Sequence, residues 1–137
     1  MKLSMANVDK DAIILDSSVW IAYFYKEDNQ HTKAVSAMAK ITTHILIPEY
    51  VLLEVVTLLR QKGYNDTACQ FMAEVTKDND RLLIHGEEYF TDTVSLFRAA
   101  KNSKLSFVDT ALLVLSQKYT VVTFDTVLNR EIMKVKR

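Results

Sequence analysis

Apolar and polar positions along this chain follow two alternating patterns, one of short apolar runs and one of helical spacing. Four short runs, rich in β-branched residues and bounded by polar ones, predict buried strands at residues 12–15, 45–47, 82–84 and 121–124. Helical spacing elsewhere predicts helices at residues 17–25, 29–41, 49–62, 66–77, 87–101, 106–118 and 126–134. This alternation predicts an α/β fold with a mainly parallel sheet covered by helices on both faces.

The length of 137 residues suits one domain, residues 1–137, that buries most of the surface its unfolded chain would expose. The first ten residues are the segment that we expect to be flexible. The N-terminal apolar stretch is too short for a signal peptide, and no apolar run approaches the roughly 20 residues of a membrane span. We therefore expect a cytoplasmic protein without a membrane segment.

The composition excludes several common kinds of functional site. Two glycines, Gly63 and Gly86, are too few for the glycine-rich loops that bind nucleotide phosphates. The single cysteine, Cys69, excludes an internal disulfide and a cysteine-rich zinc site, and we expect it to be a small buried residue on a helix. Seventeen Lys and Arg balance seventeen Asp and Glu, so the chain as a whole does not attract nucleic acid. A polyanionic substrate would need metal ions or a local basic patch.

Four acidic residues occupy positions that indicate a shared site. Asp16 directly follows the first predicted strand and Asp125 the last, and the carboxyl ends of parallel strands meet at one edge of a sheet. Glu54 and Asp109 lie in unusually apolar helical segments. If the four converge, two carboxylates about 5 Å apart repel by roughly 3 kcal/mol at an effective dielectric of 20. Such a cluster needs protons or cations, and oxygen ligands without His or Cys favour Mg²⁺ or Mn²⁺.

Each acid also has a purely structural interpretation. Asp16 and Asp125 are each placed to cap the helix that follows them. Ser106 and Asp109 have the spacing of a capping box. Glu54 lies too far inside its helix to cap it, but a buried Lys or Arg could pair with it. The residue pattern leaves both interpretations open.

At these acids the sequence resembles the PIN domain, the fold of many metal-dependent ribonucleases, and in particular the single-domain toxins of the VapC type. Four motifs carry the resemblance in order, from about residue 12 to the C-terminus: ILDSSVWIA, PEYVLLEVVTLL, LSFVDTALL and VVTFD. The resemblance implies a parallel sheet of four to five strands flanked by helices. It also implies hydrolysis of RNA phosphodiester bonds by a water nucleophile with Mg²⁺ or Mn²⁺, inhibition by a small antitoxin protein, and a homodimer.

The resemblance assigns roles residue by residue. The family's catalytic, metal-binding acids fall on Asp16, Glu54, Asp109 and Asp125. Ser17 and Thr123 fall on hydroxyl positions that support the site. Lys101 and Lys104, which precede the third motif, are weak candidates for contact with an RNA backbone, because a solvated helix end is the favoured explanation for them.

Aromatic side chains on the first helix, Trp20, Tyr23 and Phe24, have a spacing that favours packing in the core or at a dimer face over stacking on bases.

Two other functions compete with a metal-dependent endoribonuclease that acts as a toxin. The first is a catalytically silent PIN-like module that binds RNA or protein, which would have little reason to keep four poorly neutralised carboxylates. The second is a phospho-acceptor domain of the receiver type, which also gathers acids around Mg²⁺ on an α/β sheet. That fold needs an acceptor Asp after the third strand, whereas this chain has Ile84, His85 and Gly86 there. The ribonuclease is therefore the favoured interpretation.

Overall fold

The computed structural model describes residues 11–77, 81–83 and 86–136, so the prediction of a flexible segment at residues 1–10 lies outside the described residues. The elements, in chain order, are β1 (Ile13–Leu15), α1 (Ser17–Phe24), α2 (His31–Ala39), β2 (Ile45–Pro48), α3 (Glu49–Gln61), α4 (Asn65–Lys77), β3 (Leu82–Leu83), α5 (Glu87–Ala99), α6 (Phe107–Leu115), β4 (Thr120–Val122) and α7 (Thr126–Val135). Each predicted strand and helix corresponds to one of them.

The strands form a sheet in the order β3-β2-β1-β4, and every pair of neighbours is parallel. The strands β2, β1 and β4 make its body, where Ile14 of β1 is in register with Leu46 of β2 and Val121 of β4. Strand β3 adds two paired residues at the outer side of β2. The predicted parallel sheet is confirmed, and its carboxyl ends lie along one edge.

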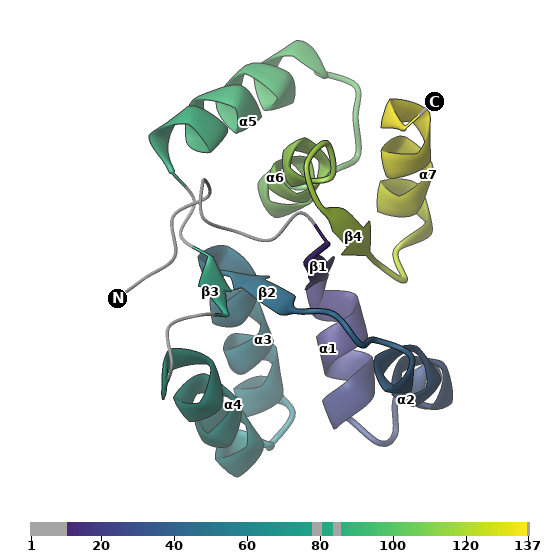
Figure 1. The fold of residues 1–137 in the computed structure, drawn as a ribbon, viewed down its shortest axis with the longest axis vertical. Coiled ribbons are helices and arrows are strands. Elements are labelled where there is room, and N and C mark those ends of the chain that lie inside the picture. Colours follow the sequence, from purple (N-terminus) through teal and green to yellow (C-terminus); the bar gives the residue numbers. More distant parts are fainter. Residues whose placement is uncertain (1–10, 78–80, 84–85, 137) are drawn as a thin grey trace.

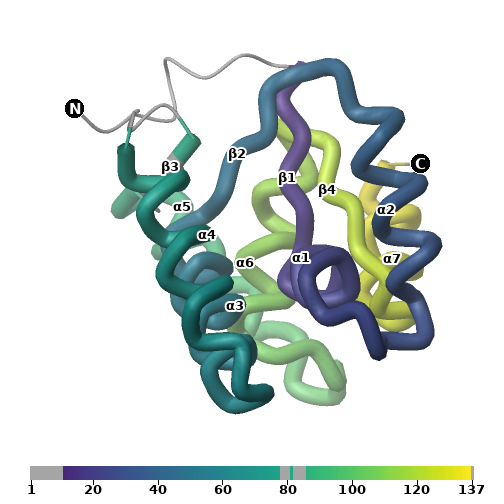
Figure 2. The backbone as a smooth tube through the Cα atoms, turned by 90° about the horizontal axis from the view of Figure 1, so that it is seen from below, coloured from purple at the N-terminus to yellow at the C-terminus, as the bar shows by residue number. Residues whose placement is uncertain are grey.

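The path of the chain explains which face each helix covers. From β1 to β2 and on to β3 the chain moves across the sheet in one direction, and right-handed connections place α1 to α4 on one face. From β3 the chain returns past β2 and β1 to β4, which places α5 and α6 on the opposite face. In Figure 1, α1 to α4 lie below the sheet and α5 to α7 above it, and Figure 2 shows the same layers from below. Helices therefore flank both faces, as predicted.

The core lies where β1 meets the helices of both layers. Ile14 and Leu15 of β1 and Leu112 of α6 are each 0% exposed. Helix α6 is buried over most of its surface, since the six consecutive residues 110–115 are all buried. This explains the strongly apolar sequence of that helix.

An aromatic cluster joins α1 to α4. The ring centroid of Phe71 lies 4.8 Å from that of Trp20 and 5.1 Å from that of Phe24. Tyr23 contacts the edge of Phe24, with 5.3 Å between their centroids. Trp20 is 7% exposed, so the predicted packing role of these aromatic residues is confirmed.

Several local predictions need correction. Helix α6 ends at Leu115 rather than at residue 118, because the chain must turn there to enter β4. Strand β2 extends one residue beyond the predicted 45–47, because Pro48 ends β2 and is the N-cap of α3. Cys69 is exposed rather than buried, since Ala68 and Phe71 are the residues in this stretch of α4 that face the core. Helix α3 ends just before Gly63, as predicted. The φ of Gly63 is 84°, which is in the left-handed region that favours glycine.

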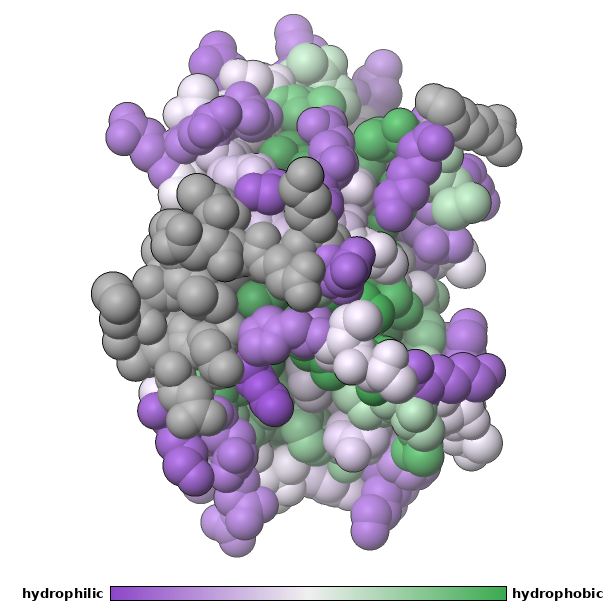
Figure 3. Space-filling view, viewed as in Figure 1, coloured by the Kyte–Doolittle hydropathy of each residue, from purple (hydrophilic) through white to green (hydrophobic). Residues whose placement is uncertain are grey.

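The visible surface of the molecule is mostly polar (Figure 3). Figure 3 shows hydrophilic side chains over much of the visible face, interrupted by smaller hydrophobic areas. No helix within residues 11–77, 81–83 and 86–136 is both long enough and apolar enough to cross a membrane.

Candidate functional site: an acid-lined cavity at the sheet edge

The chain leaves the neighbouring strands β1 and β4 toward opposite faces of the sheet. Strand β1 leads to α1 below the sheet, and β4 leads to α7 above it (Figure 1). Such a switch point opens a crevice beyond the carboxyl ends of the strands, where α/β proteins bind ligands. Asp16 directly follows β1, and its backbone N–H donates to the Val122 carbonyl of β4 at 2.9 Å. Asp125 lies three residues beyond β4, because β4 ends at Val122 and not at residue 124 as predicted.

The carboxylate of Asp16 is buried and accepts hydrogen bonds from the segments that follow β1 and β4. Its Oδ1 accepts from the backbone N–H of Ser17 at 2.7 Å and from the Ser17 hydroxyl at 3.4 Å. Its Oδ2 accepts from the Thr123 hydroxyl at 2.7 Å and from the Ser18 hydroxyl at 2.9 Å. Asp16 is 4% exposed, and all of these donors are neutral. It caps α1, as its structural interpretation predicted, and it also faces the crevice.

Glu54 is linked to Asp16 through one hydroxyl group. It lies in the middle of α3, is half-buried, and accepts a hydrogen bond at Oε1 from Ser17 Oγ. The Ser17 side chain therefore lies between two acids that are 38 positions apart in sequence. In the part of the chain that the structure describes, no ion pair reaches Glu54 or Asp16, so a buried Lys or Arg partner is not observed there.

Asp109 and Asp125 reach the same crevice from two helix N-termini. Asp109 forms the predicted capping box: its N–H donates to Ser106 Oγ at 3.0 Å, and its Oδ2 accepts from the Ser106 N–H at 3.3 Å. Asp125 caps α7, because its Oδ1 accepts from the N–H groups of Val127 at 2.9 Å and Leu128 at 3.0 Å. Each carboxylate keeps one oxygen outside these bonds, so capping does not exclude a second role.

The pKa of Asp109 depends on its burial and on the charges of the neighbouring acids. Burial is the largest effect and raises the pKa of the Asp109 carboxyl, and the negative charges of Asp16 and Asp125 raise this pKa further. The hydrogen bonds to Ser106 act in the opposite direction but do not cancel the shift. The charged form of Asp109 is therefore disfavoured in the protein without a bound cation.

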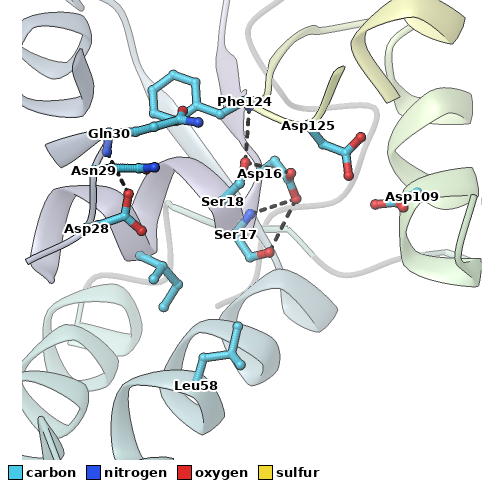
Figure 4. Close-up of a pocket in the computed structure, with 11 residues that line it drawn as sticks. Asp16, Ser17, Ser18, Asp28, Asn29, Gln30, Leu58, Asp109, Phe124 and Asp125 are labelled. Carbon is cyan, nitrogen blue, oxygen red and sulfur yellow. Dashed lines mark hydrogen bonds between the residues drawn. The ribbon is translucent and has the colours of Figure 1, made fainter. Parts of the chain in front are cut away.

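Three of the four acids line one open cavity of about 380 Å³. Figure 4 shows the carboxylates of Asp16, Asp109 and Asp125 pointing into the same part of it. However, no group of three Asp, Glu, His or Cys side chains among the described residues is arranged to hold a metal ion. Three of the four predicted acids thus share the cavity, and Glu54 is linked to Asp16 through Ser17. Caps hold Asp109 and Asp125 at their helix ends, and carboxylates without a cation between them repel.

The chemistry of the cavity nevertheless fits a hard divalent cation. Its acidic donors are all carboxylate oxygens, which Mg²⁺ and Mn²⁺ prefer. No Lys, Arg or His is among the described residues that line the cavity, so the negative charge there is not balanced from within its wall. Burial mainly, and the charges of Asp16 and Asp125 in addition, raise the pKa of Asp109 at this wall. A bound cation would balance the negative charge.

The two lysines suggested by sequence do not join the acids. Lys101 follows α5 and Lys104 lies on the connection to α6, and both are exposed. Lys101 borders a separate cavity together with Phe97 and Leu105. The structure therefore does not bring these lysines to the acid-lined cavity.

Further residues of the site, Asp28 among them, were not foreseen from the sequence. Ser18 donates to Asp16 and accepts from the Phe124 N–H at 3.1 Å, which ties the connection after β4 to α1. Phe124 and Gln30 line the cavity. The signal for Ser18 was its place two residues after the first acid, where a hydroxyl can reach back to the carboxylate. No local pattern identifies Gln30.

Comparison with known proteins agrees with this arrangement. The PIN domain family model matches residues 13–131 of the chain. No curated protein matches it. Among solved structures, that of Mycobacterium tuberculosis VapC20, a sarcin-ricin loop cleaving toxin, superposes with a TM-score of 0.76 and 22% sequence identity, covering 86% of this chain and 93% of that one. At this identity the likeness shows a shared fold, and the family model shows the relationship. The chain belongs to the PIN domain family.

Proposed function

We propose that this protein is an endoribonuclease that hydrolyses RNA phosphodiester bonds with the help of Mg²⁺ or Mn²⁺. One observation carries the proposal: three carboxylates from separate elements point into one cavity at the switch point of the sheet, with no cation among the described lining residues. PIN domain nucleases generally use divalent metal ions, which would supply the missing positive charge. The whole of residues 1–137 would serve as one catalytic domain.

The acids would divide the work by position. Asp16 and Asp109 would hold the central ion, and Glu54 would complete its surroundings or orient the attacking water. Asp125 would bind a second ion or tune the first. When bound, the metal would make a water molecule nucleophilic and stabilise charge on the phosphate oxygens. No side chain acts as a covalent nucleophile in this scheme.

The hydroxyl groups would position the buried acid. The Thr123 hydroxyl donates to one oxygen of Asp16 and the Ser17 backbone N–H donates to the other, which restricts rotation of its carboxylate. The Ser17 hydroxyl donates to Glu54, so Ser17 orients both acids. A carboxylate held in place before the ligand arrives loses less entropy when it binds.

The biological role that fits best is the toxin of a toxin–antitoxin pair in the cytoplasm. VapC20, whose fold this chain shares, is a sarcin-ricin loop cleaving toxin. The proposal includes a small antitoxin as inhibitor and a homodimer as the working form. Lys101 and Lys104 would be auxiliary contacts to the RNA backbone, away from the cavity.

Metal binding can be tested without any substrate. Mn²⁺ or Mg²⁺ at about 100 times its dissociation constant should stabilise the wild-type fold by roughly 2.7 kcal/mol. Asp16→Asn should lose most of the resulting shift in thermal unfolding temperature. Glu49→Gln, which alters an exposed acid in the first turn of α3, should keep it. A wild-type protein whose unfolding temperature no divalent ion changes would contradict the metal site.

Catalysis requires a separate measurement. The purified protein should cleave structured RNA in Mn²⁺ buffer, with a hairpin of sarcin-ricin loop sequence in the panel of substrates. Glu54→Gln should abolish cleavage while circular dichroism shows a folded protein, and Glu49→Gln should cleave like wild type. Cleavage that continues in EDTA would refute the metal mechanism.

The alternative is a catalytically silent PIN-like module that binds RNA or protein. It is favoured by the capping roles of Asp16, Asp109 and Asp125, which account for these residues structurally. The two functions differ in one result. A silent module would bind RNA but neither cleave it nor respond to divalent ions in thermal unfolding.

A further inference from the structure

Lys33 of α2 lies over the ring of Phe124, a residue that lines the acid-lined cavity. Its Nζ lies 4.6 Å from the centroid of the Phe124 ring, and Phe124 lines the cavity. The Phe124 backbone N–H donates to Ser18 Oγ at 3.1 Å, and Ser18 donates to Asp16 Oδ2 at 2.9 Å. A short series of contacts therefore connects the ammonium group of Lys33 to the buried acid.

The negative charge of the cavity wall suggests a function for Lys33. Its wall carries the carboxylates of Asp16, Asp109 and Asp125, along with that of Asp28, and its described lining residues include no cation. An RNA backbone that approaches this wall meets like charge. Metal ions would neutralise the acids only where they bind, so the phosphates that flank the bond to be cleaved need a cation beside the cavity. Lys33 is exposed and lies over a residue of this wall.

Gln30 is a second indication that this side of the cavity receives a polar ligand. Its Oε1 is buried and has no hydrogen-bond partner among the described residues. Gln30 lines the cavity together with Phe124 and is the N-cap of α2 (Figure 4). A buried amide oxygen without a donor is unfavourable, so we expect the Gln30 side chain to turn this oxygen into the cavity when a hydroxyl or amino group of a bound nucleotide can donate to it.

We propose that Lys33 binds a backbone phosphate that flanks the scissile bond, with the Phe124 ring holding the lysine in position. The RNA strand then passes along the α2 side of the cavity. The proposal rests on the proposed ribonuclease function and identifies where that function holds its substrate. The competing role is a purely structural one, in which Lys33 only covers the aromatic ring.

A matched pair of variants separates these roles. Lys62 lies over Tyr25 at 4.5 Å, so Lys62→Gln removes a similar lysine–aromatic contact whose two residues do not line the cavity. Lys33→Gln should raise KM about fivefold and leave kcat within about twofold, because an exposed charge contact mainly affects binding. It should also reduce the slope of log(kcat/KM) against log salt by about 0.7 to 0.9. Lys33→Arg should restore both values, and Lys62→Gln should behave as wild type.

RNA binding, measured by fluorescence anisotropy in the Glu54→Gln background, makes the test independent of cleavage. If wild type cleaves RNA and Lys33→Gln leaves the salt slopes of cleavage and binding unchanged, the lysine proposal is wrong and the ribonuclease stands. If RNA binds with a slope that depends on Lys33 but is never cleaved, the ribonuclease fails and the lysine contact stands. If thermal unfolding is the only property that Lys33→Gln changes, its role is structural.

Discussion

The two walls of the acid-lined cavity are built on different principles. The inner wall consists of Asp16, Ser17 and Ser18, with the buried Thr123 behind them. Its one buried carboxylate accepts hydrogen bonds from the segments that follow β1 and β4. The outer wall consists of Asp109 and Asp125, and each of these is held by its own helix N-terminus. Asp16 is 4% exposed, whereas Asp109 is half-buried and Asp125 is exposed.

The difference indicates how the site would be used. The inner wall has its geometry before any ligand arrives, because contacts between distant segments restrict its rotamers. The outer wall has local supports only, so its carboxylates can adjust when a cation enters between the walls. We therefore expect substitutions on the inner wall to affect the stability of the whole fold, and those on the outer wall to affect mainly one helix end.

The largest effect is expected for Asp16→Ala. This change removes the acceptor of the Thr123, Ser18 and Ser17 hydrogen bonds inside a buried region. Leaving several buried donors unpaired should lower the free energy of unfolding by about 3 kcal/mol. Urea denaturation without divalent ions measures this decrease in the free energy of unfolding. A loss no greater than that of Asp125→Ala would break the distinction between the walls.

A smaller decrease in the free energy of unfolding is expected for Thr123→Val, which keeps the shape of the side chain. The Thr123 hydroxyl donates to Asp16 and accepts from the Asp125 N–H at 3.0 Å, so one substitution breaks two bonds. The expected loss is about 1.5 kcal/mol in the same denaturation experiment. Thr110→Val is the control, because that buried hydroxyl bonds the Ser106 carbonyl one turn earlier. Equal losses in the two variants would show that Thr123 has no special place in the inner wall.

Asp125→Ala should behave as the loss of a helix cap. Its carboxylate satisfies two N–H groups at the start of α7, and its side chain is exposed. The expected loss is about 1 kcal/mol in denaturant. Asp125→Asn should recover most of it, because the amide oxygen can accept the same bonds. If the Asn variant is as unstable as the Ala variant, charge rather than capping is the contribution of Asp125.

The smallest effect on stability is expected for Asp109→Asn, and this substitution should stabilise the fold rather than destabilise it. Burial and the neighbouring acids raise the pKa of Asp109 in the folded protein above its ordinary value. Its contribution to the free energy of unfolding is therefore favourable at low pH and is lost as the pH rises through the folded pKa. An uncharged Asn that keeps the capping box should therefore raise the unfolding temperature at neutral pH.

The advantage of the Asp109→Asn variant should shrink as the pH falls toward about 4, because Asp109 in the wild type then becomes protonated. Thermal unfolding of both proteins across this pH range, without divalent ions, measures the difference. Asp92→Asn, which alters an exposed acid on α5, controls for the removal of one surface charge. A stabilisation by Asp109→Asn that grows toward low pH would contradict the raised pKa.

Much of the fold and part of the site could be predicted from local patterns. The spacing of apolar residues places every strand and helix, and the position of Asp16 directly after β1 follows from the strand pattern. The Ser106 and Asp109 capping box is also a local signal, since both partners lie within one helical turn. The burial of Cys69 was predicted wrongly, because its residue type is often buried but the helix face that carries it points outward.

The sequence by itself thus determined the order of elements, the parallel sheet and the helix ends at which acids lie, because these depend on backbone preferences and hydrogen bonds over a few residues. Only the tertiary structure decided which groups meet. The bond from Ser17 to Glu54, the bond from Thr123 to Asp16 and the position of Lys33 over Phe124 each join distant segments. Such contacts depend on strand register and on the packing of whole helices, and no local pattern of residues encodes these.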